Sequence, residues 1–233
     1  MRGVAGDTPK ALIPVAGLPF VFHLLTRLEE SGFDEVLLCV GHGSSRIREA
    51  VAARAGHIRA SYAEDGATLL GTLGAIVRAK AMLDASFLVT YGDSFLTFDY
   101  AGPLRMLEAS TDALGCMAVF ENHDSLEPSN VAVARDRVIR YDKRPASDDL
   151  ASGAKPRLDH IDYGAIALRR EAIEGLPVDR PLGLDGLQSS LASAGKLLAL
   201  RVEDRFYEIG SPRGLADLEH WFATRGHPGK LQP

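Results

Sequence analysis

Apolar runs that alternate with helical patterns restrict the fold of this chain more than any other feature. Continuous apolar runs predict strands at residues 35–40, 57–62, 87–91 and 114–120, and periodic patterns predict helices at 20–31, 44–53, 72–83 and 100–109. Ser44 and Ser45 are expected to cap the second of these helices, and Thr72 the third. Strands that are apolar throughout and separated by helices are typical of a parallel sheet covered on both faces.

The second half of the sequence follows a different pattern. A tight Arg135-Asp136 turn predicts a hairpin of strands 130–134 and 137–141. The polar stretch 142–155 is expected to be a mobile surface loop, and the tail 227–233 to be disordered. Further elements are expected as strands at 160–168 and 197–202 and helices at 169–175, 182–194 and 211–224.

Charge and composition exclude several classes of protein. The formal net charge is -5 and the pI about 5.8, so neither a non-specific nucleic-acid surface nor an anionic membrane surface is expected. No apolar run approaches the roughly 20 residues that span a bilayer, and the N-terminus has no apolar signal segment, which predicts a cytoplasmic protein. Cys39 and Cys116 both lie in apolar runs and are expected to be buried free thiols.

Two carboxylates follow apolar strands, where open α/β sheets bind their ligands. Asp93 comes after the run 87–90, and Glu208 precedes Ser211-Pro212, a helix start with proline at its first position. Together they fit a Mg²⁺ site that shares its ligands with substrate phosphates. The simpler interpretations are a turn aspartate bonded to its own backbone and an exposed carboxylate near a helix dipole.

Lysines and glycine-containing turns are the other candidates for phosphate or ligand binding. Lys10 and Lys143 could neutralise phosphate charge, although a solvated surface cation is the simpler interpretation of either one. The glycine turn 71–75 leads into a helix and could receive an anion or the edge of a base. Gly164, within the run 162–164, could bring backbone close to a ligand or mark a β-bulge.

These stretches together resemble the sugar-phosphate nucleotidyltransferases over nearly the whole chain. The segment from Thr8 to Pro19 resembles the P-K-x-x-x-P-V-x-x-x-P signature of that family. Other matches are Gly71-Thr72-Leu73-Gly74-Ala75 with the nucleobase segment G-T-A-G-A, Tyr91-Gly92-Asp93 with the metal site N-G-D, Tyr141-Asp142-Lys143 with the sugar-phosphate lysine, Asp162-Tyr163-Gly164 with the sugar-pocket strand, and Glu208-Ile209-Gly210-Ser211-Pro212 with D-I-G-T-P.

The resemblance implies transfer of a nucleotidyl group from a nucleoside triphosphate to a sugar 1-phosphate, with Mg²⁺ as cofactor. It assigns Asp93 and Glu208 to the metal, Lys10 to the triphosphate and Lys143 to the sugar 1-phosphate. The catalytic set is then Lys10, Asp93 and Lys143, and the substrate-binding set is Gly71, Thr72, Gly74, Gly92, Asn130, Arg144, Tyr163 and Gly164.

The implied fold is a three-layer α/β/α, Rossmann-like domain of the nucleotide-diphospho-sugar transferase type. Its sheet is expected to be mixed and mainly parallel, with a small antiparallel sugar-binding region. One domain is expected over residues 1–226, with a nucleotide-binding half (1–125), a sugar-phosphate half (126–210) and a C-terminal helix (211–226). The length resembles the short subgroup that includes heptose 1-phosphate and N-acetylmuramic acid 1-phosphate nucleotidyltransferases. The sequence leaves base, sugar and oligomeric state open, with a homodimer as one expectation.

Three departures from the family pattern leave alternatives open. Glu208 replaces the usual aspartate, and Arg144 competes with Lys143 as the sugar-phosphate ligand. The family's strand and glycine-rich loop L-A-A-G-x-G-x-R have no counterpart, since Arg2 and Gly3 match residues just beyond them. We expect either an active enzyme whose sequence begins at an internal methionine or a binding relative with impaired catalysis. A third alternative, an unrelated α/β glycosyltransferase, shares the general fold, but the D-x-D motif expected of such an enzyme is lacking.

Overall fold

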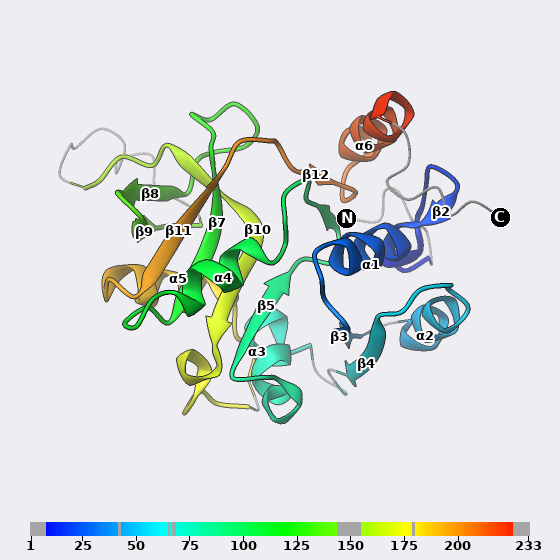
Figure 1. The fold of residues 1–233 in the computed structure, drawn as a ribbon, viewed down its shortest axis with the longest axis horizontal. Coiled ribbons are helices and arrows are strands. Elements are labelled where there is room, and N and C mark those ends of the chain that lie inside the picture. The colour runs from blue at the N-terminus through cyan, green and yellow to red at the C-terminus, as the bar shows by residue number, and fades with distance from the viewer. Residues whose placement is uncertain are drawn as a thin grey trace. The chain divides into compact units, whose positions relative to one another are not determined.

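The computed structural model describes residues 8–41, 43–64, 66, 69–143, 155–178 and 180–225. Chain contacts divide it into two compact units, each assembled from separate segments (Figure 1). Unit 1 contains residues 1–64, 91–97 and 206–233, and unit 2 contains residues 65–90 and 98–205. The single domain expected over residues 1–226 stays a prediction.

Unit 2 is built on a six-stranded mixed sheet in the order β5-β10-β7-β11-β9-β8. Its strands are β5 (Ser86–Thr90), β7 (Gly115–Glu121), β8 (Val131–Ala134), β9 (Arg137–Tyr141), β10 (His160–Arg169) and β11 (Leu197–Val202). The long strand β10 runs antiparallel between β5 and β7, and only β7 and β11 pair in parallel within this sheet. The expectation of a mainly parallel sheet is therefore not met in the described strands, because β10 separates two strands that would otherwise be parallel neighbours.

Helices cover the sheet of unit 2. They are α3 (Gly71–Arg78), α4 (Gly102–Glu108) and α5 (Leu184–Ser193), with the 3₁₀ turns η2 (Lys80–Met82) and η4 (Arg170–Ile173). Figure 1 shows α4 crossing β7, β10 and β11, and its Leu107 packs with Cys116, Ala167 and Leu198 in a buried cluster. Helix α5 packs against β9.

Unit 1 gathers short elements around an aromatic core. They are η1 (Lys10–Leu12), β1 (Pro14–Val15), β2 (Leu18–Pro19), α1 (Phe20–Glu30), β3 (Glu35–Val40), α2 (Ser44–Ala52), β4 (Arg59–Glu64), β6 (Ser94–Phe95), β12 (Tyr207–Glu208) and α6 (Pro212–Arg225). Phe20 and Leu24 of α1 pack with Phe95, Ile209 and Phe222. This core joins all three chain segments of the unit, so burial of apolar surface holds them together.

The predicted elements are largely confirmed, and most of the errors lie at their ends. The helix expected over 72–83 ends at Arg78, and the helix expected over 169–175 is only the 3₁₀ turn η4. Ser44 and Ser45 do not cap α2, because Gly43, with φ of 77°, is at the N-cap position, and Thr72 does not cap α3, because Leu70 is at that position. The hairpin of β8 and β9 is confirmed, with Arg135 left-handed at φ of 56°.

The two cysteines differ in their burial. Cys116 is buried as expected, and burial raises the pKa of its thiol to about 12. Cys39 is exposed, so the expectation of two buried thiols is wrong for this residue. The reason is local, since β3 pairs with β4 alone among the described strands and its middle residues are only partly buried.

Residues 144–154 and 226–233, where a mobile loop and a disordered tail are expected, lie outside the described residues, as do Arg2 and Gly3. Within the part of the chain that is described, no helix has both the length and the apolar character that a membrane crossing requires.

Candidate active site

Unit 1 brings Lys10 and Asp93 together, although 83 residues separate them in the chain. Lys10 begins η1 directly after Pro9, whose φ of -53° fixes the direction of the turn. Its Nζ atom donates to Asp93 Oδ2 at 3.1 Å, and both side chains are exposed. Because both side chains are exposed, their charges are accessible to a ligand. An exposed ion pair of this kind contributes little to stability.

Glu208 lies on the strand next to Asp93. In the antiparallel pair of β6 and β12 it is opposite Ser94, and the Ile209 amide donates to the Asp93 carbonyl at 3.0 Å. Its carboxylate accepts hydrogen bonds from the amides of Gly210 and Ser211 and from the Ser211 hydroxyl. These bonds place the Glu208 charge at the N-terminus of α6, where the helix dipole favours an anion.

The donor chemistry of Asp93 and Glu208 suits a hard divalent cation. Both offer carboxylate oxygens, and the ion pair with Lys10 uses only Oδ2 of Asp93. In the described residues no group of three or more His, Cys, Asp or Glu side chains is arranged to hold a metal. Two carboxylates would leave most of the coordination shell to phosphate oxygens and water, which is how Mg²⁺ is commonly bound beside nucleotides.

The predicted nucleobase segment lies at the start of α3 in unit 2. Gly71 has a left-handed φ of 69°, and both Gly71 and Thr72 are exposed. Gly74 is buried. The amides of Leu73 and Gly74 donate to the Leu182 carbonyl at 3.1 and 3.3 Å, so these two helix-start amides bond to backbone of the same unit. Gly71 and Thr72 are the members of the segment that remain accessible.

Lys143 lines a pocket of about 800 Å³ in unit 2. The wall on one side comes from the end of β9, with Arg140, Tyr141 and Asp142, and the other side comes from the first turns of α5, with Asp185, Gly186 and Ser189. Lys155 completes the lining. Arg140, Lys143 and Lys155 outnumber the two carboxylates of the lining, so the pocket keeps a small excess of positive charge for a phosphorylated ligand.

Sequence reasoning missed most of this pocket. Arg140, Lys155 and Asp185 were not predicted, and Asp185 Oδ1 lies 4.0 Å from Lys143 Nζ. The position of Asp185 in the first turn of a helix was a usable signal, because acidic residues there often have an electrostatic role. The competing candidate Arg144 lies outside the described residues.

The predicted sugar-pocket strand has a bulge in β10. The register with β7 shifts between Asp162 and Ile166, and Gly164 has φ of 93°, so the bulge interpretation of this glycine is confirmed. Tyr163 is buried in the core, with its ring edge-on to Phe98 at 5.3 Å. The structure therefore places Tyr163 among core side chains and Gly164 at the bulge.

Asn130 and Gln188 hold Asp162 beside this bulge. Asn130 Oδ1 accepts from the Asp162 amide at 2.9 Å, and Gln188 Nε2 donates to Asp162 Oδ2 at 2.8 Å. Burial raises the pKa of the Asp162 carboxyl, while the bonds from Gly164 and Gln188 and the charge of Lys143 act in the opposite direction. The Oε1 atom of Gln188 is buried and has no hydrogen-bond partner in the described structure. Neither Asp162 nor Gln188 was in the predicted set.

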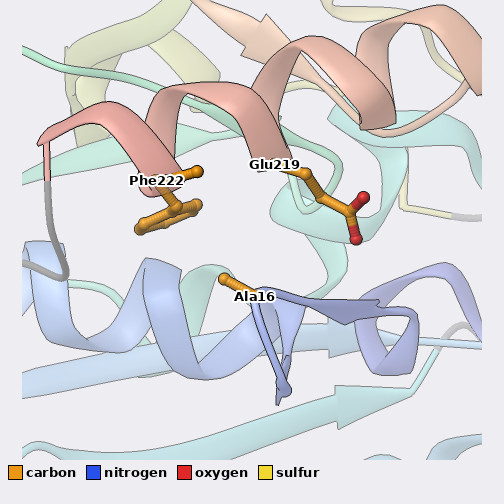
Figure 2. A pocket seen from close by; sticks show the side chains of 4 residues that line it. Ala16, Glu219 and Phe222 are labelled. Atoms are coloured by element: carbon orange, nitrogen blue, oxygen red, sulfur yellow. The ribbon is translucent and has the colours of Figure 1, made fainter.

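A second, smaller pocket of about 290 Å³ lies in unit 1 and contains none of the predicted residues. Figure 2 shows Phe222 projecting from α6 on the side that faces Ala16, which lies in the turn between β1 and β2, with Glu219 farther along the same helix. With Ala223 as its remaining lining residue, this pocket is mainly apolar. It therefore lacks the cationic groups that phosphate binding needs.

Solved structures of other proteins share the fold of this chain. HddC from Yersinia pseudotuberculosis matches with a TM-score of 0.76 over 95% of this chain and 93% of that chain, at 21% identity. A putative glucose-1-phosphate thymidylyltransferase from Bacillus anthracis matches with a TM-score of 0.80 over 99% and 92%, at 14% identity. At these identities the likeness shows the fold, a mixed α/β fold shared with sugar-phosphate nucleotidyltransferases.

Sequence comparison identifies the family. Residues 2–157 match the MobA-like NTP transferase domain, and the chain belongs to this family. It is 39% identical over 115 residues to the bifunctional protein GlmU of Cupriavidus necator, a match of 48% of this chain but only 24% of that protein. It is 24% identical over 182 residues to the N-acetylmuramate alpha-1-phosphate uridylyltransferase of Neisseria meningitidis, covering 75% of this chain and 79% of that protein.

Proposed function

We propose that this chain transfers a nucleotidyl group from a nucleoside triphosphate to a sugar 1-phosphate and releases pyrophosphate. The observation that carries the proposal is the pairing of Lys10 with Asp93, with Glu208 on the adjacent strand. The family membership and the uridylyltransferase relative, which has a similar length, support the same reaction. We also propose that the helices and sheets of this chain form the three-layer, Rossmann-like arrangement expected from the sequence.

In the proposed reaction an oxygen of the sugar 1-phosphate attacks the α-phosphorus, and the bond to the β-phosphate oxygen breaks. Lys10 would neutralise charge on the triphosphate, and Lys143 would hold the sugar phosphate with help from Arg140 and Lys155. Asp93 and Glu208 would hold Mg²⁺, which when bound supplies charge neutralisation at the reacting phosphate. The protein contributes position and electrostatics, and no covalent intermediate is required.

We propose that the nucleotide contacts Gly71 and Thr72. Gly92, which precedes the proposed metal ligand Asp93, is proposed to contact the substrate as well. Asn130 and Gly164 would shape the sugar side through the bulge that holds Asp162. The buried Tyr163 would support this strand from the core.

A pyrophosphate-release screen tests the proposal. Nucleoside triphosphates are combined with glucose, mannose, N-acetylglucosamine and N-acetylmuramic acid 1-phosphates, with and without Mg²⁺, for residues 1–233 and for an N-terminally extended form. Release that requires both substrates supports the proposal. Nucleotide binding without release in either form would favour a binding relative with impaired catalysis.

An Asp93→Asn variant sharpens the assignment. Turnover is expected to fall by about two orders of magnitude or more, because the variant loses one of the two proposed carboxylate ligands of Mg²⁺ and with it charge neutralisation at the reacting phosphate. Asp112→Asn is the matched control, since Asp112 is also exposed and pairs with Arg137 at 3.0 Å. Near-normal turnover of Asp93→Asn would remove Asp93 from the site, and equal losses in both variants would indicate a general effect on stability.

A further inference from the structure

Three backbone hydrogen bonds tie the start of α3 to a distant segment of unit 2. We call residues 180–183, which lead into α5, the Leu182 strap. The Leu182 amide donates to the Leu70 carbonyl at 2.8 Å, and the Leu182 carbonyl accepts from Leu73 and Gly74. One residue of the strap therefore bonds to both sides of the exposed pair Gly71-Thr72.

The two glycines of the segment make this close approach possible. A Cβ atom on Gly71 would lie 2.7 Å from the Leu182 carbonyl oxygen. A Cβ atom on Gly74 would lie 2.9 Å from the Leu70 Cβ atom and 3.3 Å from the Arg180 carbonyl oxygen. A side chain at Gly71 would displace the Leu182 carbonyl, and one at Gly74 would displace Leu70 and crowd the strap, so both glycines have a packing role besides any contact with a nucleotide.

The other end of the strap leads into α5, whose first turns line the Lys143 pocket. Helix α5 begins at Leu184, and its first turns place Asp185, Gly186 and Ser189 in the lining of that pocket. In the same turns, Gln188 bonds to Asp162 beside the bulge of β10. The strap and the first turns of α5, which follow it directly, therefore contact one each of the two regions assigned above to different substrates.

We propose that Leu182 is a positioning residue that couples the Gly71–Gly74 segment to the Lys143 pocket. The inference rests on the proposed function for the identity of the ligands. A phosphorylated sugar in the pocket contacts the end of β9 and the first turns of α5 together, and so resists their separation. Because the strap runs directly into α5 at Leu184, a ligand that holds the first turns of α5 also restrains the strap, and with it the nucleotide-binding turn, before any nucleotide is present.

Amide hydrogen exchange with one substrate alone tests this coupling. Glucose, mannose, N-acetylglucosamine and N-acetylmuramic acid 1-phosphates are added singly, without nucleotide. A binding probe at ten times its Kd is expected to slow exchange of the Leu73 and Gly74 amides by up to about tenfold, since only the closed form binds. Amides of α4, which lines neither region, serve as the internal reference and are expected to stay unchanged.

A Leu182→Gly variant separates coupling from simple stability. The glycine loosens the strap but leaves every residue of the pocket in place, so the probe still binds while the slowing at Leu73 and Gly74 is lost. Leu126→Gly, a change of the same kind in an exposed loop of unit 2, is the control and is expected to retain the slowing.

The outcomes distinguish the two proposals. Slowing at Leu73 and Gly74 that disappears only in Leu182→Gly supports the coupling. Binding that protects residues 137–143 without any change at Leu73 and Gly74 overturns the coupling and leaves the proposed function intact. Absence of binding and of pyrophosphate release across the whole panel overturns the proposed function, and the coupling with it.

Discussion

A buried ion pair between Glu29 of α1 and Arg54 provides the sharpest test of what stabilises unit 1. Arg54 donates to both carboxylate oxygens of Glu29, at 2.9 and 2.6 Å, and the amides of His57 and Ile58 donate to Oε1 at 2.9 and 3.0 Å. The two side chains are only 8% and 11% exposed. The carboxylate of Glu29 therefore fixes the turn that connects α2 to β4.

The magnitude follows from the pKa of Glu29. The hydrogen bonds from Arg54 lower this pKa from 4.5 to about 2, even though burial acts in the opposite direction. A difference of this size corresponds to about 3 kcal/mol in favour of the folded state when the group is ionised. Glu29→Gln keeps one oxygen that can accept from the His57 and Ile58 amides, but it leaves the Arg54 charge buried without a counter-charge. We therefore expect a loss of about 3 kcal/mol at pH 7.

Urea unfolding followed by fluorescence of Trp221, the single tryptophan, measures this loss within unit 1. Because the folded pKa is lowered, the contribution is present above pH 4.5 and is lost as the pH falls toward 2, so the difference between wild type and Glu29→Gln should shrink over that range. Glu35→Gln is the control, since its pair with Arg59 is about 70% exposed and should contribute less than about 1 kcal/mol. A loss below 1 kcal/mol for Glu29→Gln, or a difference that does not change with pH, would refute the reasoning.

Three further predictions concern the site and the thiols. Asp162→Asn should stabilise the protein near neutral pH by about 1 kcal/mol, because a neutral amide avoids burying a negative charge, although the Gln188 amide must turn over so that its oxygen, not its nitrogen, faces the new amide nitrogen. The gain should vanish in acid, since a raised pKa disfavours only the ionised wild-type carboxyl, and thermal unfolding at pH 4 and 7.5 checks this. Asp93→Asn should change the free energy of unfolding by less than about 1 kcal/mol in urea, because its ion pair is exposed; a larger loss would mean a structural role. A thiol reagent should modify Cys39 in the native protein and Cys116 only after unfolding, and rapid native modification of both would contradict the burial of Cys116.

Local sequence patterns predicted the individual helices and strands better than they predicted which strands lie side by side. The strand at Glu35–Val40 and the helix from Phe20 were correctly predicted because apolar periodicity is a property of the segment itself. The local sequences of β5 and β7 do not reveal that β10 lies between them, because strand order depends on packing between distant residues. Thr72 shows the same limit, because a cap predicted from one residue is replaced by the carbonyl of Leu182.

The candidate site was predictable where a motif carried it. Lys10 and Asp93 were placed in one site through the family resemblance, and no spacing rule would pair residues so far apart. Asp185 and Gln188 escaped prediction because a helix-start aspartate and a helical glutamine have many ordinary roles. Their function depends on what lies across from them, and a single sequence does not state this.

The construction of unit 1 from three chain segments has a consequence for synthesis. Lys10, Asp93 and Glu208 each belong to a different segment, and residues of unit 2 are made between them. The charges of the site therefore cannot assemble on a nascent chain until the segment with Glu208 has left the ribosome. No contiguous half of the protein contains all three residues, so a chain that stops early carries none of the proposed chemistry in complete form.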